Sequence, residues 1–175
     1  MRRSREEASP FIASLADDPR FGDVTEQLFE KAMMCIAVDG NYMVGDTKWH
    51  PDTSSLDYKA AKFCVYPDPL NADNGALRVI PGSHREPLHS ELDRDPQSVF
   101  GLPPNELPAY VFASQPGDVI VFNVGLWHAS CGGDHRRQGV LVYYEEPDTP
   151  EATEKIQEQM RSNHAMFARK GRKMY

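Results

Sequence analysis

The sequence lacks the features that mark membrane, exported and disulfide-stapled proteins. No apolar run approaches the roughly 18 residues that a membrane-spanning helix needs, and the charged start lacks the apolar segment of a secretory signal. The three cysteines, Cys35, Cys64 and Cys131, form no CxxC pair, so neither a zinc ribbon nor a disulfide framework is supported. These absences predict a cytoplasmic protein with no membrane partner.

Basic charge is scarce as well. The formal net charge is −7, whereas proteins that bind a phosphate backbone usually carry a basic surplus. The basic run at residues 169–173 is short, and a run of this kind is more often a solvated end than a binding patch. We therefore expect no nucleic-acid partner.

The sequence does contain a series of short β-like runs. A chain of 175 residues fits a single domain, residues 1–175, whose core needs no staples. Turn residues separate the runs and no helical pattern lies between them, which predicts a mainly β sandwich or jelly roll rather than a parallel α/β sheet. The residues Asp-Gly-Asn at 39–41 predict a turn that pairs the first two runs. The predicted strands are 33–38, 42–44, 61–66, 76–80, 110–113, 119–123 and 140–144.

A short helix is expected at each end of this β core, which spans residues 33–145. Asp23 and Glu26 have the spacing of a capping box and predict a helix over 23–32. Pro150 in a first turn, followed by apolar residues along one face, predicts a second helix over 149–169. The proline-rich polar stretch 86–109 is interpreted as a long insertion in the core.

A His-x-Asp pair, His50 and Asp52, is the first candidate for chemistry. In an extended segment residues i and i+2 point to the same side, so this imidazole and this carboxylate face one point. Similar pairs at 84/86 and 89/91 show that the spacing alone is weak evidence. We prefer His50 and Asp52 because a large aromatic residue precedes them, whereas the other pairs lie in a turn and in the polar insertion.

His128 is the predicted third ligand, because it ends an apolar segment that follows the strand at 119–123. Two histidines and one carboxylate on one face of an octahedron leave positions open for a co-substrate and dioxygen, as non-haem Fe(II) oxygenases require. Arg136 and Arg137 follow within nine residues. A guanidinium fork suits a carboxylate such as the distal one of 2-oxoglutarate. Since neighbours in a strand face opposite ways, only one of the two arginines can take this part.

Four stretches together resemble the phytanoyl-CoA dioxygenase family. They lie in the family's order between about residues 40 and 145, at 45–52, 62–85, 117–123 and 128–137, and the second contains NGALRVIPGSHR. The resemblance implies a double-stranded β-helix, which is a cupin-like jelly roll, with Fe(II) as metal and 2-oxoglutarate as co-substrate. It further implies an enzyme that hydroxylates a small organic substrate with dioxygen and releases succinate and CO2.

The resemblance also assigns roles to single residues. It makes three residues the metal ligands and catalytic centre: His50, Asp52 and His128. It makes Arg137, or as second choice Arg136, the 2-oxoglutarate ligand. Arg137 is preferred because it would share an inner face with residues 139, 141 and 143, where Gly139 leaves room for a carboxylate. Related halogenases replace the metal-binding carboxylate with a small residue, so the presence of Asp52 favours hydroxylation.

Other side chains are predicted around the site. Candidates for contacts with 2-oxoglutarate are Thr47, Lys62 and Asn74. Candidates for the lining of the substrate cavity are Trp49, Phe63, Tyr66 and Trp127, although plain core packing explains each of them as well. His84 is interpreted as closing its own turn. Because only about 45 residues precede the first motif, a second subunit is one way in which the pocket would be completed, and an oligomer is expected on that reading.

Two other functions stay open at this point. A cupin-like metalloenzyme would use the same three ligands without 2-oxoglutarate and would leave both arginines in solvent. A catalytically silent family member would act as a binding protein, holding metal without coupling 2-oxoglutarate decarboxylation to a substrate.

Overall fold

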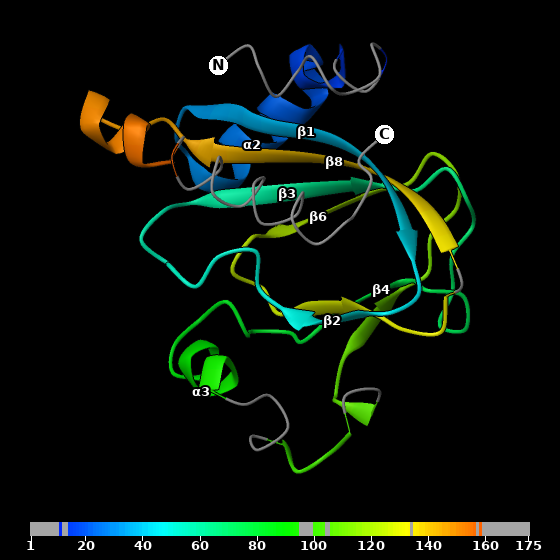
Figure 1. Cartoon of the computed structure of the whole chain (residues 1–175). Coiled ribbons are helices and arrows are strands. Elements are labelled where there is room, and N and C mark those ends of the chain that lie inside the picture. The colour runs from blue at the N-terminus through cyan, green and yellow to red at the C-terminus, as the bar shows by residue number, and fades with distance from the viewer. Residues whose placement is uncertain are drawn as a thin grey trace.

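Two four-stranded antiparallel sheets packed face to face form the core of the computed structural model (Figure 1). The structure describes residues 11, 14–94, 100–103, 106–133, 135–156 and 158. The first sheet has the order β1 (Met33–Val44), β8 (His135–Glu145), β3 (Ala60–Val65) and β6 (Val119–Asn123). The second has the order β2 (Thr47–His50), β7 (His128–Ser130), β4 (Leu77–Val79) and β5 (Tyr110–Phe112). Successive strands mostly alternate between the sheets, so the predicted mainly β jelly-roll class is confirmed.

Apolar residues fill three separate layers around these sheets. One cluster lies between the sheets and joins Cys64 and Val140 of the first sheet to Leu77 and Val79 of the second. A second cluster lies on the outer side of the first sheet and packs Leu141 and residues around it against α2 (Pro19–Phe29). Both faces of the first sheet are therefore buried near its centre. A third cluster lies beneath the second sheet, where α3 (Leu88–Arg94) packs.

The observed helices differ from the predicted ones in their bounds. Helix α2 begins at Pro19 and not at residue 23, because Asp18 is its N-cap and accepts a hydrogen bond from the Arg20 backbone N–H at 3.0 Å. A 3-10 turn, η1 (Leu15–Asp17), precedes it. The predicted insertion 86–109 contains α3 rather than loop alone. Residues 150–156 are helical as predicted, and residues 159–169 of that helix lie outside the described residues.

Strand β1 corrects the predicted turn at residues 39–41. It runs as one strand from Met33 to Val44 and pairs with β8 from end to end, with one register shift between Cys35 and Ala37 and with Gly40 opposite Gly139. The turn residues are accommodated because β8, with 11 residues against the 12 of β1, is long enough to pair with all three of them, and Gly139 opposite Gly40 places no side chain there. Pairing with a distant strand has thus overridden a local turn preference.

Neither a disulfide nor a membrane-spanning helix is found in the described part of the chain. All three cysteines are free thiols, with Cys64 buried and the other two partly buried. No helix among the described residues combines the length and hydropathy that crossing a bilayer requires.

Candidate metal centre

The structure brings His50, Asp52 and His128 together at the inner side of the second sheet. Strands β2 and β7 pair with His50 directly opposite His128, and the two imidazole centroids lie 4.5 Å apart. Asp52 follows β2 by two residues, and its backbone N–H donates to the Val124 carbonyl at 2.9 Å. One ligand atom from each of the three side chains lies within 4.8 Å of the others. Among the described residues this is the one group of histidine, cysteine and carboxylate side chains so arranged.

Backbone carbonyls hold both imidazoles in one orientation. The Nδ1 atom of His50 lies 2.7 Å from the Lys48 carbonyl, and the Nδ1 atom of His128 lies 2.8 Å from the Leu126 carbonyl. A carbonyl can only accept, so each Nδ1 carries the proton and each Nε2 carries a lone pair. Hydrogen bonds of this kind fix the tautomer and the ring direction of metal-binding histidines.

The Asp52 carboxylate has one oxygen satisfied and one left over. Its Oδ1 accepts from the Lys62 ammonium at 2.9 Å, whereas its Oδ2 is buried and has no hydrogen-bond partner among the described residues. Oδ2 lies 3.8 Å from Nε2 of His128. A buried carboxylate oxygen without a hydrogen-bond donor is unfavourable unless a cation binds to it. Two imidazole nitrogens and this oxygen are a donor set that fits Fe(II).

Burial and neighbouring charges set the protonation states of the site. Burial acts to raise the pKa of the Asp52 carboxyl, but the charge of Lys62 and its hydrogen bond act against burial, and this pKa is lowered. Burial lowers the pKa of His128 to about 3, which keeps the imidazole neutral. The site therefore presents an ionised carboxylate and a neutral imidazole at neutral pH, the forms that bind a metal ion.

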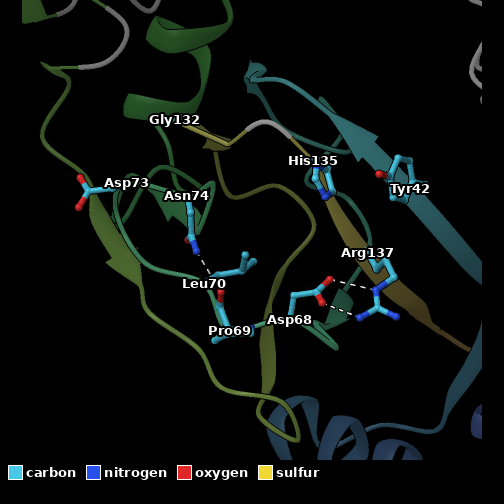
Figure 2. Close-up of a pocket in the computed structure, with 9 residues that line it drawn as sticks. All are labelled: Tyr42, Asp68, Pro69, Leu70, Asp73, Asn74, Gly132, His135 and Arg137. Atoms are coloured by element: carbon cyan, nitrogen blue, oxygen red, sulfur yellow. Dashed lines mark hydrogen bonds and ion pairs between the residues drawn. The ribbon is translucent and has the colours of Figure 1, made fainter.

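The two arginines of β8 face opposite ways. Arg136 is 2% exposed, and its guanidinium donates to the Gly45 carbonyl at 2.9 Å. Arg137 has 60% of its side chain exposed and forms an ion pair with Asp68, with Nε 3.0 Å from Oδ2. Figure 2 shows this pair at the edge of a surface hollow of about 540 Å³ that Asn74 also lines.

The prediction that Arg137 shares the inner face was wrong. Residues 137, 139, 141 and 143 do share a face, but Leu141 and Tyr143 of that face pack against α2 on the outside of the sheet. Arg136 shares its face with Gln138 and Val140, and both contact residues between the sheets. Apolar residues on both faces of β8 made the inner face impossible to identify from alternation.

Three of the four predicted cavity residues lie away from the metal centre, which corrects that prediction. Trp49 precedes His50 within β2, and Trp127 directly precedes His128 at the start of β7. Both tryptophans pack beneath the second sheet, on the side of α3. Phe63 packs on the outer side of the first sheet. Tyr66 does lie between the sheets, where its hydroxyl accepts from the Gln138 amide at 2.9 Å.

Thr47 and Asn74 are occupied by hydrogen bonds to the backbone. The Thr47 hydroxyl accepts from the Ser130 N–H at 2.8 Å and so supports the pairing of β2 with β7. The Asn74 side chain accepts from the Asn71 N–H at 2.6 Å and donates to the Pro69 carbonyl at 3.1 Å, which closes its own turn. Lys62, the third predicted co-substrate contact, instead lies against Asp52, the predicted metal ligand.

The histidines of the two other His-x-Glu pairs lie apart from this group. His89 was expected in a solvated segment, but it is 2% exposed and its Nδ1 lies 3.0 Å from the Ser83 carbonyl. His84 accepts a hydrogen bond from its neighbour Arg85 at 3.3 Å. Neither histidine joins a metal-binding group among the described residues.

Sequence reasoning missed two side chains, Gln138 and Tyr144, that share the inner face with the site. Gln138 contacts the Cys64 thiol at 3.4 Å as well as Tyr66. Tyr144 lies close enough to Asp52 that burial and this charge raise its pKa to about 12. The available signal was Gln138, a polar residue within an apolar strand. Every second residue of a strand faces the same side, so residues 140, 142 and 144 share the face of Gln138.

Gly133 allows the segment before β8 to touch the turn before β4. A Cβ at this position would lie 2.9 Å from the Asn74 carbonyl oxygen and 2.9 Å from the Gly75 Cα, which are backbone atoms that cannot rotate away. We expect Gly133→Ala to lower the free energy of unfolding by about 1–3 kcal/mol in urea denaturation.

In Gly22→Ala, by contrast, the added Cβ meets no atom within 4 Å. That helix variant should gain about 0.5–1 kcal/mol. Equal stabilities for the two variants would contradict the close approach.

Comparisons with known proteins agree with this geometry. The phytanoyl-CoA dioxygenase (PhyH) family matches residues 3–139. The ectoine dioxygenase of Sphingopyxis alaskensis is 28% identical over 165 residues, which cover 77% of this chain and 54% of that protein. The chain therefore spans about half the length of this curated relative.

Solved structures give the same fold. The structure of EctD from S. alaskensis with bound Fe is 28% identical, with a TM-score of 0.59 over 77% of this chain and 53% of that one. HygX from Streptomyces hygroscopicus, solved with nickel and 2-oxoglutarate, is 18% identical, with a TM-score of 0.61 over 80% of this chain and 66% of that one. The likeness to HygX shows the fold alone. The family match extends over most of the residues that build the two sheets and all three ligand positions, and the chain belongs to the phytanoyl-CoA dioxygenase family.

Proposed function

We propose that this chain is an Fe(II)- and 2-oxoglutarate-dependent dioxygenase that hydroxylates a small organic substrate. The observation that carries the proposal is the convergence of three ligand atoms within 4.8 Å, one of them a buried carboxylate oxygen without a donor. Retention of the carboxylate favours hydroxylation over halogenation. The relative found in S. alaskensis is an ectoine dioxygenase, and its structures include one with bound Fe and one with 2-oxoglutarate and 5-hydroxyectoine.

Each residue of the site has a distinct part in this proposal. Bound Fe(II) with 2-oxoglutarate would supply the oxidation of a substrate C–H bond to C–OH by dioxygen, with succinate and CO2 as the other products. His50, Asp52 and His128 hold the metal, and the carbonyls of Lys48 and Leu126 keep the imidazoles aimed at it.

Arg136 is the residue that we assign to the distal carboxylate of 2-oxoglutarate. It is the arginine of β8 that points between the sheets, where it is 2% exposed and its guanidinium donates to the Gly45 carbonyl. Arg137 already has Asp68 as its anion at the surface. The proposal gives Thr47 and Asn74 no contact with 2-oxoglutarate, because their side chains are held by backbone groups.

Partners and location follow from the same reasoning. We propose a small molecule and dioxygen as the partners of the site, with neither nucleic acid nor membrane, in keeping with the net charge of −7. Three free thiols support a reducing compartment such as the cytoplasm. Self-association stays a prediction, and light scattering of the purified chain tests it.

Anaerobic titration with Fe(II) and 2-oxoglutarate tests the proposed function. We expect the weak visible absorption of a keto acid chelated to Fe(II), followed by succinate formation when dioxygen is admitted. Metal binding without this absorption would favour a cupin-like enzyme that does not use 2-oxoglutarate. If the absorption appeared but no succinate formed with any of the substrates tested, a silent binding protein would be favoured. A folded chain that binds no Fe(II) would remove the proposal altogether.

A further inference from the structure

Lys62 reaches across the space between the two sheets to the metal ligand Asp52. It lies on β3 of the first sheet, opposite Phe122 and Val142, whereas the metal ligands lie on or beside strands of the second sheet. Its ammonium is 2.9 Å from Asp52 Oδ1, and only 15% of its side chain is exposed. Among the described residues, Asp52 is its one hydrogen-bond partner.

The position of this charge is unusual because it competes with a metal ion for the same carboxylate. Side chains that hydrogen-bond to a metal ligand commonly raise the ligand's basicity, so their removal weakens metal binding. A cation on the second oxygen of the ligand acts in the opposite direction, because it withdraws negative charge and repels the metal. The Phe122 ring, whose centroid is 5.8 Å from the ammonium, adds an attractive contact that keeps the charge in place.

We propose that Lys62 is a positioning residue that limits the metal affinity of the site and makes Asp52 a ligand through Oδ2 alone. This inference rests on the proposed function, since it requires that the three ligands bind a metal. In the metal-free protein, Lys62 neutralises a partly buried carboxylate that would otherwise have no cation beside it. In the loaded protein, it keeps Oδ1 engaged, so that Asp52 offers the metal a single oxygen and leaves other positions for co-substrate and dioxygen.

A purely structural role for the same ion pair makes a different prediction. If Lys62 only ties the two sheets together, its removal lowers the stability of the metal-free and the metal-loaded protein equally, and the metal affinity does not change. If Lys62 and the metal compete for Asp52, its removal destabilises the metal-free protein more, and by linkage the metal then binds more tightly. The sign of the affinity change therefore separates the two roles.

The test uses Co²⁺ binding to the chelator-treated full chain, without 2-oxoglutarate, followed by calorimetry and by the visible Co²⁺ spectrum. We expect Lys62→Met to lower the Kd for Co²⁺ about tenfold or more, because a unit positive charge near the divalent ion is lost. The melting temperature of this variant should fall without Co²⁺ and approach that of the wild type at saturation. Lys62→Arg, which keeps the charge, should bind Co²⁺ as the wild type does.

Lys59→Met is the matched control, since Lys59 lies three residues earlier and donates to the Phe29 carbonyl at the surface. It removes an equal charge away from the metal centre and should leave the Kd unchanged. If Lys62→Met does not fold, Lys62→Gln makes the same comparison. Unchanged or weaker Co²⁺ binding in a folded neutral variant overturns this inference alone. A wild-type chain that binds no Co²⁺ overturns the proposed metal centre with it.

Discussion

Replacing His128 by alanine is expected to abolish both Fe(II) binding and the Fe(II)–2-oxoglutarate absorption. In the proposed centre His128 supplies one of the three ligand atoms found among the described residues, and its ring centroid lies 4.5 Å from that of His50 and 4.9 Å from that of Phe122. Changes in groups that merely support a ligand cost about 10–100-fold in metal affinity, so the loss of a ligand should cost at least about 100-fold. Calorimetry with Co²⁺ and the anaerobic titration with Fe(II) measure the two effects.

Loss of a buried imidazole also affects stability, and this effect must be separated from metal binding. His128 is 5% exposed and satisfies the Leu126 carbonyl, so the metal-free alanine variant should lose about 1–3 kcal/mol. His89→Ala is the matched control. His89 is likewise buried, and its Nδ1 satisfies the Ser83 carbonyl. It should lose similar stability and keep full metal affinity. Retention of Co²⁺ binding by His128→Ala would show that the three ligands were wrongly assigned.

The sequence predicted the strands better than it predicted their pairing. Strand β6 was placed at its observed bounds because alternation and flanking turns are local properties of residues 119–123. Strand β1 was divided into a hairpin, because nothing in residues 39–41 indicates that a partner 100 residues away will pair with them. The N-terminal helix was displaced because two acceptable caps, Asp18 and Asp23, lie close together and only packing chooses between them.

The convergence of the three proposed ligand side chains was predictable for a physical reason that does not extend to their surroundings. The i, i+2 rule holds in any extended segment, so the direction of His50 relative to Asp52 follows from the sequence. Which side of the sheet counts as the interior is a property of the whole fold. The pairing of Arg137 with Asp68 across 69 residues, and the placement of Lys62 against Asp52, both depend on that property. Charged residues near a site are therefore harder to assign than the ligands themselves.

The inner position of Arg136 predicts the second large effect. We expect Arg136→Met to raise the Kd for 2-oxoglutarate, measured in the presence of Co²⁺, by about 100-fold. The reason is that losing one partner of a buried, hydrogen-bonded charge pair costs about 2–5 kcal/mol. Arg136→Lys should recover only part of the affinity, since an ammonium keeps the charge but lacks the two-pronged geometry of a guanidinium. Co²⁺ affinity without 2-oxoglutarate should stay at the wild-type value in both variants.

Arg137→Met provides the control on the neighbouring residue. Its guanidinium is exposed and paired with Asp68 at the surface, where ion pairs contribute little. We expect its Kd for 2-oxoglutarate to change by less than about twofold, which corresponds to a few tenths of a kcal/mol. A large loss in Arg137→Met, with little change in Arg136→Met, would mean that 2-oxoglutarate binds outside the space between the sheets. If both variants kept the wild-type Kd for 2-oxoglutarate, neither arginine would hold the co-substrate.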